Sequence, residues 1–431
     1  MIDRTLLKLA VLGVALCGSL LASRVLKEVP ATRRWALFAI GILPFLDLQH
    51  FSVSFLTDDW YRGDSAGLSV TAVDCLTLAL WLALPRSPGP FRWLRWLYFA
   101  VALAGLPLSP VPPYAAFSLW KLVRMYALVD VVWTACADEG GPPALLAGMG
   151  LGVAWQGVLT LNEHYLLHRY QAHGAFDHQN TLGMACGLVA PVALALVLAR
   201  PGLRLAWLTL AGASLAVLFS LSRGSLTMML GAFALVACLS AARELTRRKA
   251  ALAAVGLLAV ALLAVRVWPT WSDRFHNAPR ASADGRVQFE QAASLMTADH
   301  PFGLGMNQFS WSLEHLGYAD RVGLTGHDRG SVVHNIYWLT AAELGWLGLL
   351  VYLLLLAAPL WTALSSGLRA RDDVRGDVLI GCAAGLIATY GHGTLEWVAR
   401  QTAFAYVFWA MVALVAAVAH QARAAAAPAP A

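Results

Sequence analysis

Residues 331–350 read SVVHNIYWLTAAELGWLGLL and join a polar segment to a long apolar one. The polar pair His334-Asn335 lies at the junction, and the apolar residues continue almost unbroken to Leu364. A helix needs about 20 apolar residues to cross a bilayer, so this stretch predicts a membrane helix. An ionisable imidazole is costly to place at the end of such a helix. His334 is therefore either a functional group or an interfacial histidine in contact with lipid headgroups.

The composition of the whole chain agrees with a membrane protein. Of its 431 residues, 59% are hydrophobic and 13% are charged, whereas a soluble protein contains about 25% charged residues. The apolar runs are continuous rather than alternating, which indicates helices and excludes a β-barrel. The six cysteines lie within or at the ends of these runs and form no Cys-x-x-Cys pair, so we expect neither a disulfide framework nor a metal site. The sequence predicts an all-α polytopic membrane protein without a cofactor.

Thirteen apolar segments are candidates for membrane helices. They are residues 5–23, 35–57, 69–85, 93–108, 115–136, 143–161, 181–199, 203–221, 224–241, 250–268, 334–364, 377–395 and 401–420. Lys and Arg gather in loops 24–34, 85–95, 242–250 and 365–376. The positive-inside rule places these loops in the cytoplasm if the helices alternate. We attribute the formal charge of +6 to such loops and not to nucleic-acid binding.

The opposite side then carries the long segment 269–333, whose five arginines and seven acidic residues show no basic excess. We expect it to be a small helical insert outside the cytoplasm, between membrane parts 1–268 and 334–421. Residues 422–431, ARAAAAPAPA, are low in complexity and predict a disordered tail.

Several polar groups lie at the outer ends of the predicted helices. Lys121 and Arg124 share a helix face, and they either bind an anionic ligand or extend outward to the membrane interface. His178 and Asn180 supply hydrogen-bond donors in an outer loop, and Asn180 is also placed to cap the helix that follows. These four residues are candidates for ligand binding.

Two arginines are placed to contact phosphate or substrate. Arg223 lies at a corner where two long apolar runs meet, and such a turn offers backbone N–H groups beside a guanidinium fork. Arg286 either binds the substrate or forms a surface salt bridge with Asp284 or Glu290. It begins an amphipathic stretch, 286–298. The residues of this stretch available for burial are Val287, Phe289, Ala293, Leu295 and Met296.

Other ionisable groups are given structural roles. Asp74 lies about one turn inside its apolar segment, and we interpret it as a hydrogen-bonding group. Glu343 lies well inside the apolar run that follows His334, and we assign it to structure rather than catalysis. His392, Glu396 and Arg400 are spaced by four residues, which would place them on one helical face and favours an ion-pair ladder.

The spacing of His334-Asn335, nine residues, Gly345, two residues and Gly348 resembles the signature of bacterial O-antigen ligases. These enzymes belong to a superfamily with O-antigen polymerases and protein O-oligosaccharyltransferases. Further stretches resemble patterns of the same superfamily: Gly-x-Phe-x-His-x-Asn-x-x-Gly at 174–183, Ser-Arg-Gly at 222–224, and Gly285-Arg286 followed by Pro301-Phe302-Gly303-Leu304-Gly305. The resemblance implies twelve membrane helices with both ends in the cytoplasm. The segments from residue 35 onward supply these twelve, so 5–23 is either an extra span or lies differently.

The resemblance also implies a reaction. The expected enzyme is a glycosyltransferase of the inner membrane of a Gram-negative bacterium, with its active site facing the periplasm. It transfers O-antigen polysaccharide from undecaprenyl diphosphate to lipid A-core, with inversion at the anomeric carbon and without a metal ion. An imidazole titrates near neutral pH, so His334 is expected to take the proton of the acceptor hydroxyl. Arg223 and Arg286 are expected to stabilise the leaving diphosphate. The expected substrate-binding residues are Lys121, Arg124, His178, Asn180 and Asn335.

Two alternatives stay open at this point. An O-antigen polymerase or a protein O-oligosaccharyltransferase uses the same class of donor, and the residues do not identify the acceptor. A transporter or flippase for lipid-linked sugars is the competing class. It calls for internal repeats and broken helices near the membrane midplane, and we find no convincing repeat. Membrane lipids are expected partners, and nucleic acid is not.

Alanine substitution of Arg223 and Arg286, singly and together, tests whether both bind one diphosphate. Groups that bind one ligand are coupled, so the double variant is expected to lose less transition-state stabilisation than the two single variants added together. Lysine keeps the charge but not the bidentate fork, so each Arg→Lys variant should lie between the wild type and the alanine variant. The measurements are turnover and donor affinity. Additive losses with unchanged donor affinity would show that the two arginines do not share the diphosphate.

Overall fold

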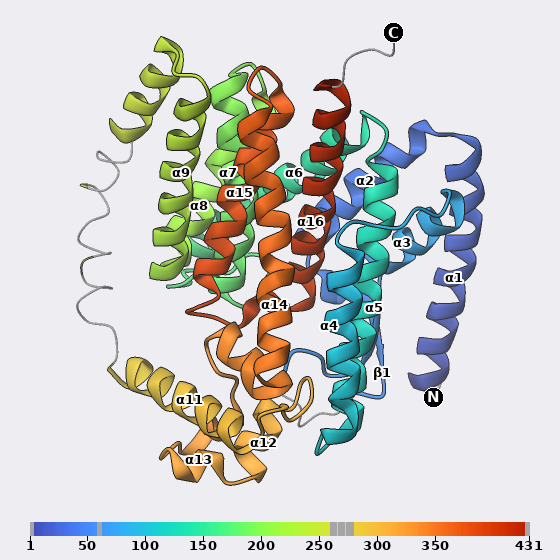
Figure 1. The fold of residues 1–431 in the computed structure, drawn as a ribbon, viewed down its shortest axis with the longest axis vertical. Helices are drawn as coiled ribbons and strands as arrows, with labels where there is room; N and C mark the ends of the chain where they lie inside the picture. Colours follow the sequence, from blue (N-terminus) through green and yellow to red (C-terminus); the bar gives the residue numbers. More distant parts are fainter. Residues whose placement is uncertain (1–3, 58–62, 259–264, 266–271, 273–279, 427–431) are drawn as a thin grey trace. The chain divides into compact units, whose positions relative to one another are not determined.

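The computed structural model describes residues 4–57, 63–258, 265, 272 and 280–426. Helices dominate these residues, together with one two-stranded antiparallel sheet (Figure 1). The predicted all-α class is confirmed. The helices are α1 Arg4–Glu28, α2 Ala31–Ile42, α3 Ala72–Ala83, α4 Arg92–Ala104, α5 Pro112–Ala135, α6 Gly141–Tyr165, α7 Gln179–Ala199, α8 Arg204–Ser220, α9 Arg223–Arg243, α11 Arg280–Asp299, α12 Phe309–His315, α13 Tyr318–Arg321, α14 Ile336–Arg369, α15 Val374–His392 and α16 Thr402–Ala426. Residues 247–258 are also helical.

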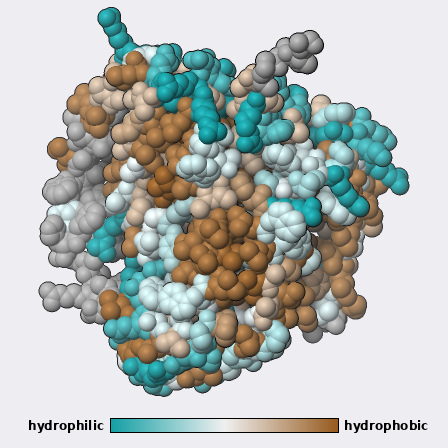
Figure 2. Space-filling view, viewed as in Figure 1, coloured by the Kyte–Doolittle hydropathy of each residue, from teal (hydrophilic) through white to brown (hydrophobic). Residues whose placement is uncertain are grey.

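Within the described residues, six helices are long and apolar enough to cross a membrane, namely α1, α6, α7, α9, α14 and α16. Helices α3 and α8 are apolar but shorter. Helix α5 is less apolar because it carries Lys121, Arg124 and Asp130. Apolar side chains are exposed over much of the face drawn in Figure 2 (brown), as expected for helices in contact with lipid. These helices indicate a membrane protein, and the count of twelve or thirteen spans remains a prediction.

The single span predicted over 35–57 is wrong. Helix α2 ends at Ile42, a 3-10 turn containing Pro44 follows, and Asp47 adopts a left-handed conformation with φ 54°. The chain then forms strand β1, Ser52–Phe55, which pairs antiparallel with β2, Leu68–Thr71. Because β2 occupies the start of the predicted span 69–85, α3 begins only at Ala72. Small polar and apolar residues alternate in both strands. This pattern is typical of β-strands, and a search for continuous apolar runs does not detect it.

The described chain divides into two compact units, and each is considered by itself. The first comprises Met1–Gly148, Asp284–Pro359 and Gly393–Leu414. The second comprises Met149–Ala283, Leu360–His392 and Val415–Ala431. The unit boundaries fall within helices α6, α11, α14 and α16.

In the first unit, the insert packs against the beginning of α14. Figure 1 shows α11, α12 and α13 gathered beside the first turns of that helix. Their shared apolar core contains Phe289, Ala292, Ala293, Met296, Leu304, Phe309, Leu313, Tyr318, Ala319, Leu324, Val332, Val333, Leu339 and Ala342. The amphipathic pattern therefore identified Phe289, Ala293 and Met296 correctly. Leu295 is partly buried against this core, whereas Val287 is exposed, so the prediction for Val287 was wrong.

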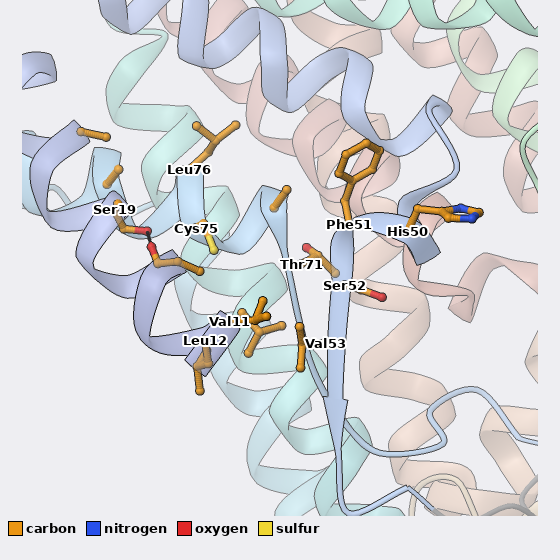
Figure 3. A pocket seen from close by; sticks show the side chains of 16 residues that line it. Val11, Leu12, Ser19, His50, Phe51, Ser52, Val53, Thr71, Cys75 and Leu76 are labelled. Carbon is orange, nitrogen blue, oxygen red and sulfur yellow. Dashed lines mark hydrogen bonds between the residues drawn. The ribbon is translucent and has the colours of Figure 1, made fainter. Parts of the chain in front are cut away.

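Helix α1 also belongs to the first unit and packs along α3. Between α1, α3 and the β-hairpin lies an apolar groove of about 640 Å³ (Figure 3). Small residues such as Ser19 on α1 and Cys75 on α3 line it, with Val53 contributed by β1. Segment 5–23 is thus part of a helix long enough to span a membrane, and its orientation remains a prediction.

In the second unit, α7 packs against α8, α9 and α15 (Figure 1). Helix α15 approaches α7 closely because Gly381 and Gly385 face it. A Cβ atom at Gly381 would lie 2.4 Å from the Cα of Val192, and one at Gly385 would lie 2.3 Å from the carbonyl oxygen of Leu188. Neither backbone atom can move aside as a flexible side chain would.

Two predicted regions lie at the edges of the described chain. The predicted span 250–268 is helical through residue 258 and lies mostly outside the described residues beyond that point. The predicted disordered tail 422–431 is helical up to Ala426, because α16 continues through the alanine-rich sequence. Residues 427–431 lie outside the described part.

Gly381→Ala tests the close approach of α15 to α7. The added Cβ overlaps backbone, so we expect a loss of roughly 1–3 kcal/mol in the free energy of unfolding. The matched control is Gly187→Ala on α7, where an added Cβ meets nothing within 4 Å. Alanine favours a helix over glycine, so this control should keep or raise stability. The measurement is thermal unfolding of the purified protein in detergent, and equal effects of both substitutions would contradict the packing described.

Candidate active site

The candidate active site in the first unit begins at the start of α14. Asn335 caps this helix, because its Oδ1 accepts hydrogen bonds from the backbone N–H of Tyr337 (3.1 Å) and Trp338 (3.3 Å). Its Nδ2 donates to Oε1 of Glu290 on α11 at 3.0 Å. The two ends of the Asn335 amide therefore bind the start of α14 and helix α11. His334 is the residue immediately before this fixed position.

His334 is held by a buried carboxylate. Its Nδ1 lies 2.9 Å from Oε2 of Glu396, and the Glu396 side chain is only 2% exposed. The other carboxylate oxygen, Oε1, accepts a hydrogen bond from Nη2 of Arg286 at 2.9 Å. The His334 and Arg286 side chains are 34% and 40% exposed. One buried acid thus positions two accessible groups from different segments of the chain.

This geometry selects one tautomer of His334. An ionised carboxylate only accepts hydrogen bonds, so Nδ1 carries the proton that it donates to Glu396. The lone pair of Nε2 is then available to accept a proton from a bound molecule. The tautomer follows from the hydrogen-bond partner rather than from a visible hydrogen atom. Glu396 would also stabilise the imidazolium formed after such a transfer.

The ion-pair ladder predicted for 392–400 is wrong. Helix α15 ends at His392, and only a short 3-10 turn, Val398–Arg400, follows. The expected single helical face is therefore absent from this described segment. Glu396 instead binds His334 and Arg286, while Arg400 binds Glu343 and Thr340.

The sequence contained a signal for this break. Glycine at 391 and 393 flanks the point where the helix ends, and glycine there favours termination. The backbone carbonyl of Gly393 accepts a hydrogen bond from the Ile336 N–H at 2.9 Å. This bond ties the segment that carries Glu396 to the start of α14. The partners of Glu396 are 62 and 110 residues away in sequence, beyond the reach of local spacing.

The glycine motifs of the insert and of α14 pack on one another. Gly345 interrupts α14 with φ 67° and ψ −176°, a conformation that only glycine adopts readily. Because of the break, backbone carbonyls of the preceding turn accept hydrogen bonds from outside the helix. Leu304 N–H bonds to the carbonyl of Ala342 (3.2 Å), and Gly305 N–H to that of Glu343 (2.8 Å).

The close approach of loop 301–305 and α14 leaves no room for a side chain at Gly303 or Gly345. A Cβ at Gly303 would lie 2.3 Å from the Glu343 carbonyl oxygen, and one at Gly345 would lie 2.3 Å from that of Pro301. At Gly348, an added Cβ would lie 2.2 Å from Cβ of Leu344. Gly285 differs, since an added Cβ there meets nothing within 4 Å.

Lys121 and Arg124 are both buried in ion pairs. Lys121 Nζ lies 2.5 Å from Oδ2 of Asp64 and also donates to the carbonyl of Arg400 at 2.9 Å. Arg124 Nη1 lies 2.7 Å from Oδ2 of Asp74. In this arrangement neither cation is exposed to a ligand or extended outward, so neither of the two roles expected from the sequence matches it.

Asp74 and Glu343 have the structural roles that the sequence analysis assigned to them, and Asp64 is held by nearby cations. Asp74 forms a capping box with Thr71 at the start of α3, as expected for a hydrogen-bonding group. Burial alone would raise the pKa of Asp64, but the charges of Lys121 and Arg400 outweigh it and hold the pKa below its ordinary value. Glu343 bonds to Arg400 and to the backbone N–H of Phe309, in agreement with its assigned structural role.

In the second unit, two predicted motifs meet. Ser222 caps α9 and donates a hydrogen bond to Oδ1 of Asn180 at 2.6 Å. A Cβ at Gly183 would lie 1.9 Å from Oγ of Ser225, so the two helix starts are in close contact. Arg223 is exposed at the first position of α9.

The cap of α7 differs from the prediction. His178, rather than Asn180, is the N-cap residue, since its Nδ1 accepts the hydrogen bond of the Asn180 N–H at 3.2 Å. The Asn180 side chain is directed to Ser222 instead. The structure thus brings His178, Asn180 and Arg223 into one neighbourhood of the second unit, and His334, Asn335 and Arg286 into one neighbourhood of the first.

Among the residues that the structure describes, no group of three or more His, Cys, Asp or Glu side chains is placed to hold a metal ion. In this part of the described chain, His334 pairs with the carboxylate of Glu396, which also pairs with the guanidinium of Arg286.

Comparison with known proteins bears on the central part of the chain. Residues 205–353 match the model of the O-antigen ligase family. This range contains Arg223, Arg286 and His334 together with Gly345 and Gly348, and it ends before Glu396. No curated protein matches the chain. The match over residues 205–353 supports a relation of this part of the chain to the O-antigen ligase superfamily, whose members are glycosyltransferase-like enzymes.

Proposed function

We propose that this protein is an O-antigen ligase that transfers O-antigen polysaccharide from undecaprenyl diphosphate to lipid A-core. The observation that carries the proposal is the placement of His334 and Arg286 on the two oxygens of one buried carboxylate. A proton acceptor and a phosphate-binding cation thereby lie in one neighbourhood of the first unit. The family match supports an enzyme that acts on lipid-linked glycans in general.

The proposed reaction uses these two groups at opposite ends of the reacting centre. The acceptor hydroxyl attacks the anomeric carbon of the glycan and loses its proton to Nε2 of His334. A new C–O bond to the acceptor forms as the C–O bond to the diphosphate breaks. The bonding electrons leave with the diphosphate, where the guanidinium of Arg286 stabilises the developing charge. Attack from the side opposite the leaving group inverts the anomeric configuration.

Glu396 supports both steps in this proposal. It holds the tautomer that makes Nε2 a base, and it stabilises the imidazolium that results. It also fixes one nitrogen of the Arg286 guanidinium at 2.9 Å, while the remaining nitrogens of that forked group provide further donors. The proposed reaction needs no metal ion, because guanidinium groups of the chain stabilise the charge that develops on the diphosphate.

The proposed location is the inner membrane of a Gram-negative bacterium. His334 lies just before α14, which is long and apolar enough to span the membrane. The basic loops predicted on the cytoplasmic side support a periplasmic position for this end of α14. Lipid-linked donor and lipid acceptor would both reach it from the membrane surface.

The acceptor decides between the members of the superfamily. Purified protein in liposomes is given a lipid-linked glycan with lipid A-core, with an acceptor protein, or with donor alone. We expect lipid A-core to be glycosylated and no polymer or glycoprotein to form. His334→Ala should abolish this transfer while the protein remains folded and inserted, because the base is lost.

The matched control is His315→Ala, which removes an exposed histidine of α12 that stacks on Trp311. This variant should ligate normally. Glycosylation of the acceptor protein alone would overturn the ligase assignment, and normal ligation by His334→Ala would overturn the assignment of the base.

Glu396→Gln tests the buried carboxylate. The amide has nearly the same shape but cannot stabilise an imidazolium, and its NH₂ group favours the wrong tautomer of His334. We expect kcat to fall by roughly 10²–10⁴-fold, the range typical of general base catalysis. The binding of an unreactive donor analogue should change much less, because Arg286 keeps its charge.

Glu314→Gln serves as the control, since Glu314 lies on α12 and is not a hydrogen-bond partner of His334 or Arg286 in the described structure. A purely structural role for Glu396 would instead lower thermal stability and donor binding together with kcat. That outcome, or normal turnover by Glu396→Gln, would refute the positioning role.

A further inference from the structure

An apolar surface lies beside the break in α14. Phe302, in the loop between α11 and α12, is 79% exposed. Trp346 and Leu347, which directly follow the break, are 56% and 58% exposed. Phe302 adjoins the break itself, because a Cβ atom at Gly345 would lie 2.9 Å from the Phe302 Cα. The insert and α14 therefore contribute to one contiguous surface.

This surface continues along α14. Leu350, Leu353 and Leu354 are also exposed, and they belong to a helix long enough to cross a membrane. The residues of α14 just before the break, 339–345, are buried in protein. The exposed apolar face of α14 thus begins at residue 346, level with Phe302.

Exposure of this surface to water would be unfavourable. Burial of a side chain such as Phe or Leu contributes about 1.5–3 kcal/mol, and contiguous exposed apolar residues mark a contact surface. Its continuity with the face of a membrane helix identifies the contact as lipid. Aromatic side chains are enriched at the boundary between headgroups and acyl chains, which suits Phe302 and Trp346.

We propose that Phe302, Trp346 and Leu347 form a lipid anchor that rests in the membrane interface where α14 enters the bilayer. Phe302 is the informative member, because it belongs to the insert and not to a membrane helix. The hydrogen bonds from Leu304 and Gly305 to α14 hold the Phe302 loop at this level. Through that loop, which follows α11 directly, the anchor fixes the insert against the membrane surface. The inference depends neither on the reaction catalysed nor on which side of the membrane the insert occupies.

Fluorescence quenching measures this placement directly. The exposed thiols are removed by Cys17→Ser and Cys238→Ser. An environment-sensitive fluorophore is then attached after Phe302→Cys, and the protein is reconstituted in phosphatidylcholine–phosphatidylglycerol liposomes. We expect blue-shifted emission, strong quenching by a lipid with a nitroxide near its headgroup, and little quenching by aqueous iodide.

The control label is placed by Asp320→Cys, at a charged residue of α13 whose side chain is 67% exposed. It should show the opposite pattern, with quenching by iodide and not by the lipid nitroxide. Trp346→Cys provides a second position in the anchor if the Phe302 variant fails to fold, and it should behave as position 302 does. Quenching of the anchor labels by iodide would show that the surface faces water. Quenching by neither agent would show that protein, such as a second copy of the chain, covers it. Either result would overturn the proposal.

Discussion

The described site depends on the burial of a single carboxylate. An ionised acid taken out of water must be compensated by donors, and Glu396 finds two of them, the imidazole of His334 and the guanidinium of Arg286. In turn, the Glu396 carboxylate holds the imidazole of His334 and the guanidinium of Arg286 in place. Removal of the whole Glu396 side chain would therefore release both groups at once. The backbone bond between Ile336 and Gly393 brings the segment of Glu396 to α14, so the site rests on that contact as well.

Burial of charge recurs elsewhere in the first unit. Lys121 pairs with Asp64, Arg124 with Asp74, and Arg400 with Glu343. Isolated cations at these positions would be very unfavourable, and each has an acid as its partner. The cations of these three pairs are buried, whereas Arg286 pairs with a buried acid and is itself 40% exposed. This difference in exposure separates these three buried pairs from the pair of Arg286 with Glu396, which is proposed to contact the substrate.

The sequence predicted those features that local pattern determines. Continuous apolar runs gave the helical class, whereas the functional role of His334 stays a prediction. The amphipathic stretch 286–298 gave most of the buried face of α11. Several predictions failed because they depended on contacts between residues far apart in the sequence. Glu396 could not be paired with His334 from spacing. Lys121 and Arg124 were expected to bind an anionic ligand or to extend outward, because their acidic partners lie 57 and 50 residues away.

Some misreadings had a local cause. The hairpin of β1 and β2 was hidden because its alternating strands adjoin apolar helices, so hydropathy joined them into single spans. Asn335 was taken as a substrate ligand, although asparagine just before a helix is also a common cap. The glycines at 303 and 345 were recognised as a motif, but the reason for them, a direct backbone contact between loop and helix, appears only in three dimensions.

The order of the three site residues along the chain has a consequence for biosynthesis. Arg286 and His334 are synthesised first, and Glu396 follows only after α14 and α15. A nascent chain that has not reached residue 396 therefore contains the base and the cation but not the acid that orients them. The candidate site can therefore assemble only after α15 has been synthesised, and a shorter ribosome-bound intermediate already holds lipid-facing helices without it.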